Sequence, residues 1–425
     1  MKKNYVFVCV FFAAVALYAG GKKDNLSFIG QTGNYSNAAK VLSERLAQEN
    51  GSTPVDIYDV AYASLHESIM LDLSGGSGSY DLVMTNASWL EECSQYFMDL
   101  TPFVKEAGID LSQFSKSTID ACMINGTLYA LPVAPTPNMM AYRTDLVKNP
   151  PKTWDEYLKI AASYTDPSKG MYGVSLPGAK AQCAVLFLVR LWSMGQDVAD
   201  ENWNVIVDSS IGRKAMQHLK DTMQYADPAC LTWGLNEAHA AFLQGNAVFC
   251  EAWPTLGIAQ KADNAELSKI KGKWAMAPFP EDASGVKQMS LQCFGISKSC
   301  KNPQAAFNFI KNYVSADYQK ECYGTYSTLP SLLSFYDTTA IRNSPLAALG
   351  DGFRGICLTK WNIYASAEQD TIMTNAVGAF MAGEMDLNAT MDYYQKNLSR
   401  ALEQTKPKYK NQHAIKIMQA VKNRK

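Results

Sequence analysis

The sequence is poor in the residues that build metal and nucleophilic sites. Its 425 residues include only four histidines, which are His66, His218, His239 and His413. None of them belongs to an H-E-x-x-H pair, and no C-x-x-C pair is present, which argues against a zinc or thioredoxin-like site. The glycine patterns of phosphate loops, dinucleotide-binding turns and nucleophile elbows are also missing. We therefore expect neither a metal nor a cofactor.

The sequence also lacks an excess of either positive or negative charge. The chain has 39 Lys and Arg residues against 40 Asp and Glu residues, whereas nucleic-acid binding usually needs a basic surface. We expect no nucleic-acid partner. The hydrophobic share of 47% is typical of a globular protein and, with the length, indicates two or three domains.

The first 19 residues have the pattern of a secretory signal peptide. Lys2 and Lys3 precede an uncharged run over 5–19, which is shorter than the roughly 20 residues that cross a bilayer. We expect cleavage after Ala19 and a periplasmic or extracellular protein, with a membrane anchor as the alternative. Gly20 stands where a lipoprotein would carry cysteine, so a lipid anchor is disfavoured. No later stretch is long and apolar enough to span a membrane.

Nine cysteines follow the signal region, and an odd number cannot all pair within one chain. We expect them to be small buried hydrophobic residues, and one or two disulfides stay open. They are Cys93, Cys122, Cys183, Cys230, Cys250, Cys293, Cys300, Cys322 and Cys357.

Strand and helix patterns alternate along the chain. Short apolar runs at 26–29, 55–60 and 80–84 enclose helical patterns, which predicts βαβ units and a mainly parallel sheet. Thr153 and Glu156 form a predicted capping box for a helix over 154–162. The last 60 residues are mainly helical.

Polar and aromatic residues recur where the predicted strands end. Ligands of open α/β sheets bind at the carboxyl ends of strands, so these residues are candidate ligand contacts. They are Gln31, Thr32, Asn86, Trp89, Glu251, Trp253, Gln292 and Phe294. Aromatic rings pack against the C–H face of a sugar, and amide and carboxylate groups match its hydroxyls. A core position stays open for Trp89, and local backbone bonding stays open for Asn86 and Gln292.

The order of several motifs resembles the extracellular solute-binding proteins of bacterial ABC importers, in the carbohydrate-binding branch that includes maltose-binding protein. Single motifs are loose, but their order extends over about 300 residues. They are YDLVMTNASW at 80–89, NGTLYALP at 125–132, MAYRTDL at 140–146, PKTWDE at 151–156, AFLQGNAV at 241–248, WP at 253–254, FGISK at 294–298, PQAAFNFI at 303–310 and LP at 329–330.

The resemblance implies an α/β fold of two lobes joined by several crossing strands, each lobe a mainly parallel sheet flanked by helices. Lobe 1 would comprise 25–135 and 282–328, and lobe 2 would comprise 136–281 and 329–425. Closure about a hinge would trap a sugar or oligosaccharide in the cleft, and a membrane permease would recognise the closed form. The protein would be a monomeric binding protein and not an enzyme.

The resemblance also supports particular ligand contacts. It supports Thr32, Asn86, Trp253, Gln292 and Phe294 by position, and more weakly Gln31, Tyr142, Glu251, Arg354, Trp361 and Tyr364. An ordinary surface salt bridge is the alternative for Arg354. Asn86 stands where the family often has Asp, and Cys293 where it has a small or aromatic residue, so the ligand's identity stays open.

Two other functions stay open. Capture of a polyamine or amino acid would need a cage of carboxylates, and Glu251 is the single acid among the candidate contacts. A secreted glycoside hydrolase would need two carboxylates about 5–10 Å apart in the cleft.

Overall fold

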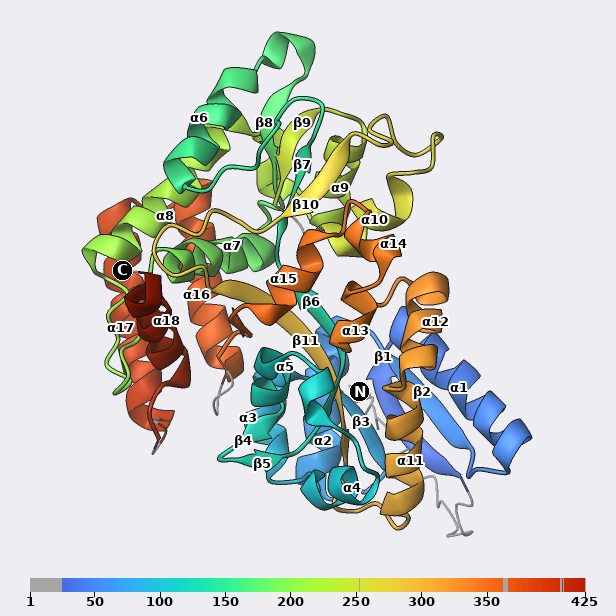
Figure 1. Cartoon of the computed structure of the whole chain (residues 1–425). Coiled ribbons are helices and arrows are strands. Elements are labelled where there is room, and N and C mark those ends of the chain that lie inside the picture. The colour runs from blue at the N-terminus through green and yellow to red at the C-terminus, as the bar shows by residue number, and fades with distance from the viewer. Residues whose placement is uncertain (1–24, 252, 362–365, 406, 408, 425) are drawn as a thin grey trace, which may run out of the picture.

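The computed structural model describes residues 25–251, 253–361, 366–405, 407 and 409–424. Two sheets lie at opposite ends of the molecule, with helices around each (Figure 1). We call the part around the six-stranded sheet β12-β11-β3-β1-β2, with β6 beside β11, lobe 1. The part around the four-stranded sheet β10-β7-β9-β8 is lobe 2. The predicted two-lobed α/β fold is confirmed, while the predicted lobe boundaries stay a prediction.

Lobe 1 begins with the predicted strand–helix alternation. Its first elements are β1 (Leu26–Gln31), α1 (Asn34–Asn50), β2 (Val55–Val60), α2 (Tyr62–Gly75), β3 (Leu82–Asn86), η1 (Ala87–Trp89), α3 (Leu90–Ser94), α4 (Thr101–Glu106), α5 (Lys116–Ala121), β4 (Met123–Ile124) and β5 (Thr127–Leu128). Strand β1 pairs in parallel with β2 and with β3. The carboxyl ends of these three strands therefore share one edge of the sheet.

The chain then passes into lobe 2. Strand β6 (Leu131–Pro137) still belongs to the sheet of lobe 1 and leads into lobe 2. The elements that follow are β7 (Met140–Arg143), α6 (Trp154–Tyr164), β8 (Tyr172–Ser175), α7 (Lys180–Ser193), α8 (Ser210–Thr222), α9 (Leu235–Leu243), β9 (Ala247–Cys250), α10 (Ile258–Lys261) and β10 (Trp274–Ala277). The capping box predicted for α6 is present, because Glu156 N donates to Thr153 Oγ1 and Thr153 N donates to Glu156 Oε2.

The sheet of lobe 2 is mixed and not mainly parallel. Only β8 and β9 pair in parallel, whereas β7 is antiparallel to β9 and to β10. Strands β7 and β10 carry the chain into and out of this lobe, so they run in opposite directions beside each other. Sequence alternation alone does not reveal this pairing.

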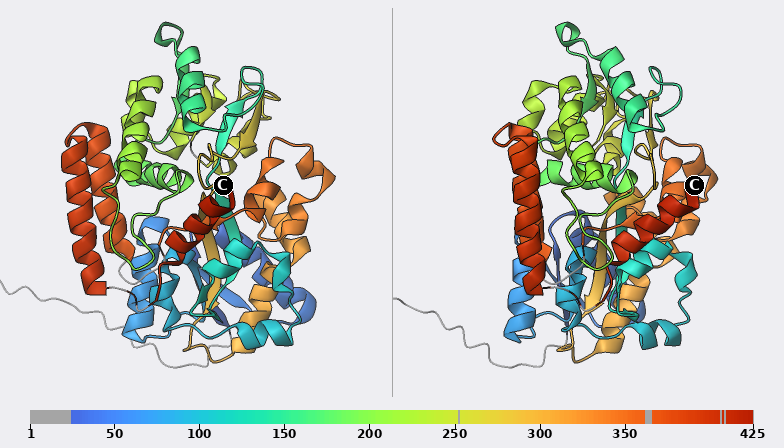
Figure 2. Two further views of the ribbon diagram at one scale, coloured as in Figure 1. Left: turned by 60° about the vertical axis from the view of Figure 1, so that its left-hand side comes forward. Right: turned by 90° about the vertical axis from the view of Figure 1, so that its left-hand side faces the viewer.

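The rest of the chain returns to lobe 1 and then crosses again. It contains β11 (Lys287–Ile296), α11 (Pro303–Tyr313), α12 (Ala316–Tyr326), α13 (Leu333–Tyr336), α14 (Thr339–Arg342), α15 (Ala348–Arg354), β12 (Cys357–Leu358), α16 (Ser366–Ala382), α17 (Leu387–Thr405) and α18 (Gln412–Arg424). Helices α16 and α17 lie side by side, and α18 lies across the junction of the two lobes (Figure 2). Lys416 on α18 forms an ion pair with Asp120 on α5 at 2.8 Å.

Two hydrophobic cores hold the molecule together. One centres on the sheet of lobe 1, and the other packs α6, α7 and α8 against α16 and α17. All nine cysteines after the signal region are buried, and none of them forms a disulfide within the described part of the chain. They therefore act as small apolar residues. In the described ranges we find no helix with the length and apolarity needed to cross a membrane.

Candidate ligand pocket between the lobes

A pocket of about 320 Å³ opens between the lobes and is lined from both of them. Lobe 1 contributes the start of α2 and the turn after β3, while α7, α16, α17 and the segment after β12 close the other side. The lining residues are Ala63, His66, Ser88, Trp89, Leu188, Trp192, Val198, Lys360, Trp361, Ala367, Gln369, Asp370, Thr371, Met373, Tyr394 and Leu398. Aromatic and aliphatic walls with a few polar groups are typical of small-molecule sites.

On the side of lobe 1, Trp89 is positioned by the turn that ends β3. Asn86 Oδ1 accepts from Ser88 N at 3.0 Å and from Ser88 Oγ at 2.8 Å, which caps the short helix η1. The Trp89 ring stacks on Tyr62 with ring centroids 5.4 Å apart and lies 4.9 Å from His66. Asn86 therefore orients the pocket-lining turn, as its local-bonding alternative predicts.

On the side of lobe 2, one buried carboxylate holds two tryptophans of the pocket. Asp197 Oδ1 accepts from Trp192 Nε1 at 2.9 Å, and Asp197 Oδ2 accepts from Trp361 Nε1 at 2.9 Å. Asn411 Nδ2, just before α18, also donates to Oδ2 at 3.0 Å. Asp197 thus fixes the orientation of both rings and ties them to the C-terminal segment.

Trp361 also forms part of a second cavity of about 510 Å³. Trp203 and Tyr409 line this second cavity but not the pocket. The Trp203 ring meets Trp361 edge-on at 5.4 Å, and Trp203 Nε1 donates to the Tyr409 carbonyl at 2.7 Å. Trp361 therefore stands as a wall between the two spaces.

The charged side chains that line the pocket are already paired. His66 Nε2 lies 2.8 Å from Glu92 Oε2, and Lys360 Nζ lies 2.7 Å from Asp370 Oδ1. No unpaired charge lines the pocket among the residues that the structure describes. A group of three or more metal-ligating side chains is also absent from the described part of the chain.

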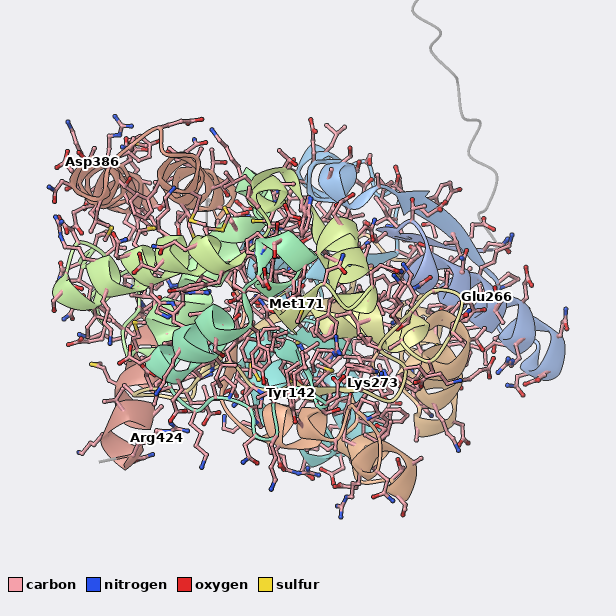
Figure 3. All side chains as sticks on the ribbon, turned by 90° about the horizontal axis from the view of Figure 1, so that it is seen from above. Tyr142, Met171, Glu266, Lys273, Asp386 and Arg424 are labelled. Atoms are coloured by element: carbon pink, nitrogen blue, oxygen red, sulfur yellow. The ribbon has the colours of Figure 1, made fainter. Side chains whose placement is uncertain are left out.

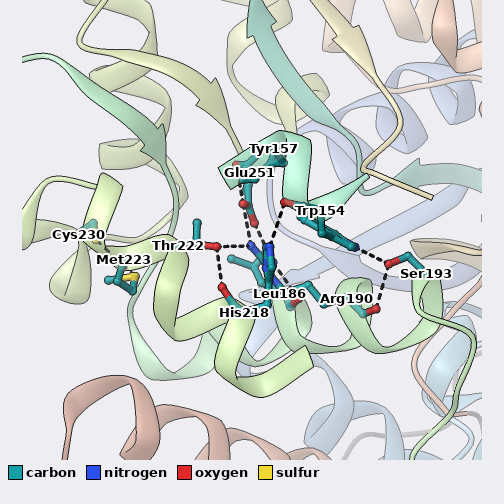
Figure 4. A network of polar contacts seen from close by, with 10 residues as sticks. All are labelled: Trp154, Tyr157, Leu186, Arg190, Ser193, His218, Thr222, Met223, Cys230 and Glu251. Atoms are coloured by element: carbon teal, nitrogen blue, oxygen red, sulfur yellow. Dashed lines mark hydrogen bonds and ion pairs between the residues drawn. The ribbon is translucent and has the colours of Figure 1, made fainter. Parts of the chain in front are cut away.

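Glu251 does not line the pocket, and its predicted ligand contact stays a prediction. Its side chain is 0% exposed, and it accepts from Arg190 Nη1 at 3.0 Å, Arg190 Nη2 at 2.8 Å and the Tyr157 hydroxyl at 2.6 Å (Figure 4). The Arg190 guanidinium also lies over the Trp154 ring, 4.5 Å from its centroid. The carboxylate that follows β9 therefore serves an internal ion pair of lobe 2.

Trp253 follows this ion pair and has an unusual backbone. Its φ of 40° lies in the left-handed region, which is rare for a bulky residue. The side chain is 9% exposed but belongs to neither hydrophobic core, and Nε1 lacks a partner among the described residues. Strained residues of this kind cluster at functional sites, which agrees with the ligand role predicted for Trp253. That role stays a prediction.

Two other candidates are engaged elsewhere. The Phe294 ring is fully buried against Phe28 and Tyr313 in the core of lobe 1, so its ligand contact stays a prediction. Arg354 pairs with Asp337 on the surface at 2.5 Å, as its salt-bridge alternative predicts.

Four further candidates do not line the pocket. Tyr142 lies in the sheet of lobe 2, where β7 pairs with β10 next to Lys273 (Figure 3). Gln31 ends β1 and Thr32 follows it, at the same sheet edge as Asn86. Gln292 pairs with Asn86 across β11 and β3. Tyr364 lies outside the described residues. Trp89 and Trp361 are thus the candidates that the structure brings together in one pocket.

The model of a family described as bacterial extracellular solute-binding proteins matches residues 42–348. The chain belongs to this family. It is an extracellular family of binding proteins and not of enzymes. Residues 1–24, which include the predicted signal peptide, lie outside the described residues.

Two relatives and one solved structure illustrate the similarity. A protein of Deinococcus radiodurans, described as "Probable ABC transporter-binding protein", is 25% identical over 62% of this chain and 65% of its own length, slightly under two thirds. A protein of Sinorhizobium fredii, described as "Probable amino-acid ABC transporter periplasmic-binding protein", is 24% identical over 71% of this chain and 70% of its own length. The maltose-bound MalE3 structure of T. maritima is 23% identical and covers 89% of this chain and 100% of its own, with a TM-score of 0.77.

Sequence reasoning missed several residues of this solute-binding protein's pocket. Trp192 and Gln369 lie on α7 and α16, where helical periodicity indicates buried residues and not ligand contacts. Asp197 lies just after the apolar helix α7. An isolated acid beside an apolar run is the sequence signal that could have indicated a buried polar contact at this position. The rule that ligands bind at the carboxyl ends of strands cannot identify pocket residues that lie on helices.

The buried network around Arg190 predicts a pH dependence of stability. His218 Nδ1 accepts from Arg190 Nε at 3.1 Å, and burial followed by the charge of Arg190 lowers the pKa of His218 from 6.5 to about 3. The native imidazole is then neutral while the unfolded one gains a proton below its ordinary pKa. Unfolding free energy is expected to fall by about 1.4 kcal/mol per pH unit as the pH drops from about 6.5 towards 3.

His218→Gln isolates this contribution, because the amide can accept from Arg190 and donate to the Trp154 carbonyl without titrating. Urea denaturation at several pH values should give the variant a shallower loss of stability than the wild type. Equal slopes would show that His218 does not couple to unfolding.

Proposed function

We propose that this protein captures a sugar or oligosaccharide in the interlobe pocket, without altering it, and delivers it to the permease of an ABC importer. The observation that carries the proposal is the pocket wall, where Trp89, Trp192 and Trp361 face a space with polar groups and no unpaired charge among the described lining residues. Flat aromatic surfaces suit the C–H face of a sugar ring. The proposal is supported by the similarity to a probable ABC transporter-binding protein and to a solved structure with bound maltose.

An amino acid is the second candidate, because one relative is described as an amino-acid-binding protein. An amino acid carries both a carboxylate and an ammonium group, and each would need an opposite charge in a water-poor pocket. His66, Lys360 and Asp370 already have such partners, which favours the sugar. Hydrolysis is disfavoured because Asp370 is the single carboxylate among the described lining residues, whereas glycosidases use two.

A thermal-shift panel tests the proposal. Purified protein is mixed with monosaccharides, maltose and longer oligosaccharides, the common amino acids, and polyamines. Because ligand binds only the folded state, a sugar at about 100 times its Kd should add about 2.7 kcal/mol and raise the Tm by several degrees. Chromatography should recover the sugar unchanged. A response to amino acids or polyamines with none to sugars would overturn the proposal.

A further inference from the structure

The pocket contains a buried amide that has no hydrogen-bond partner among the described residues. Gln369, near the start of α16, is 6% exposed and lines the pocket. Neither its Oε1 nor its Nε2 has a hydrogen-bond partner in the part of the chain that the structure describes. Buried side-chain amides are nearly always hydrogen-bonded, because an unpaired donor or acceptor is costly. The exception therefore points to a partner that comes from outside the chain.

The chemistry of an amide limits what that partner can be. Gln369 presents an acceptor and a two-proton donor side by side. Two neighbouring hydroxyls offer the matching donor and acceptor, whereas a carboxylate offers acceptors alone and an ammonium group offers donors alone. Around the amide stand apolar and aromatic walls, among them Leu188, Trp361 and Met373. Such walls would accept the carbon skeleton of the same molecule.

We propose that Gln369 is a ligand-binding residue that hydrogen-bonds a pair of adjacent hydroxyls and so selects polyhydroxy solutes over amino acids. The inference rests on the proposed function of the pocket and identifies Gln369 as the residue that recognises the hydroxyls of the ligand. A polyhydroxy ligand would form hydrogen bonds with both Oε1 and Nε2 of Gln369. A ligand without adjacent hydroxyls would leave one of these buried atoms unpaired, so it would bind more weakly.

Gln319 provides a matched control within the same chain. This glutamine on α12 in lobe 1 is also buried, but its amide is satisfied internally. Gln319 Nε2 donates to the Val133 carbonyl at 3.3 Å, and Oε1 accepts from Ser331 N at 2.7 Å and from Ser331 Oγ at 3.1 Å. Replacement by leucine should therefore have opposite effects at the two positions.

The experiment compares Gln369→Leu with Gln319→Leu. Urea denaturation without ligand should find Gln369→Leu at least as stable as the wild type and Gln319→Leu less stable. Calorimetric titration with glucose, maltose and their single-deoxy analogues should find about tenfold or greater loss of affinity in Gln369→Leu, and none in folded Gln319→Leu. A deoxy analogue that lacks a hydroxyl bound by Gln369 should bind the wild type more weakly than the parent sugar does. The deoxy analogue and the parent sugar should bind Gln369→Leu with equal affinity.

The outcomes separate the two hypotheses. Equal sugar affinity in Gln369→Leu and the wild type would overturn the role of Gln369 and leave the proposed function standing. A loss of stability in ligand-free Gln369→Leu matching that of Gln319→Leu would also overturn the inference, because it would reveal an internal partner. A wild type that binds amino acids and no sugar would overturn both.

Discussion

Replacing Arg190 with methionine is expected to lower the free energy of unfolding by about 3–5 kcal/mol. Arg190 and Glu251 are both 0% exposed, so the variant leaves a carboxylate inside lobe 2 with no cation beside it. The same change removes the hydrogen bond to Thr222 and the contact with the Trp154 ring. Urea denaturation followed by circular dichroism measures the loss.

The double variant Arg190→Met, Glu251→Leu is the control. Buried ion pairs can often be replaced by apolar residues of similar volume at little cost, because both desolvation penalties disappear together. The double variant should recover most of the stability, with a remaining loss from the Tyr157 hydroxyl, which donates to Glu251 in the wild type. If Arg190→Met and the wild type unfold at the same urea concentration, the ion pair contributes no net stability.

This ion pair is a structural role of Glu251 that the sequence does not reveal. A polar residue directly after a strand of an α/β sheet is a reasonable candidate contact. The partner that internalises it lies 61 residues away on a helix that the sequence identifies only as apolar and buried. A buried arginine within such a helix signals an internal acid, but the pattern does not say which acid.

The elements themselves were largely predictable, because each carries a local signal. The period-two and apolar runs of β1 and β2, the Thr153–Glu156 capping box and the helical spacing of α11 are encoded within a few residues. Sheet pairing in lobe 2 is not local, since β7 and β10 are more than 100 residues apart in the chain. The antiparallel pairing of these strands therefore appears only in the folded molecule.

The pocket was predictable in part for the same reason. Trp89 follows β3 directly, so the strand-end rule makes it a candidate, and the family resemblance supports Trp361 more weakly by position; both line the pocket. Asp197 bonds to Trp361 and to Asn411 in the C-terminal segment, and Gln369 lines the pocket from α16. Their roles depend on burial and on the presence or absence of partners, and neither property is visible in one sequence.

Trp361→Ala is expected to weaken sugar binding by about 30- to 100-fold, the scale of a central aromatic contact in an interface. The ring lines the pocket, and its orientation is held by the bond from Nε1 to Asp197. Asp197 keeps Trp192 and Asn411 as partners after the substitution, so the carboxylate is not left unpaired. Calorimetric titration with the sugar that gives the largest thermal shift measures the change.

Trp203→Ala is the matched control, because the Trp203 ring touches the other side of Trp361 and lines the second cavity but not the pocket. Deleting this buried ring should cost about 3–5 kcal/mol of stability, as large-to-small core substitutions do. Affinity of the folded variant should change less than fivefold, since Asp197 still orients Trp361. Equal losses of affinity in the two variants would mean that Trp361 supports the fold of the junction and does not contact the ligand.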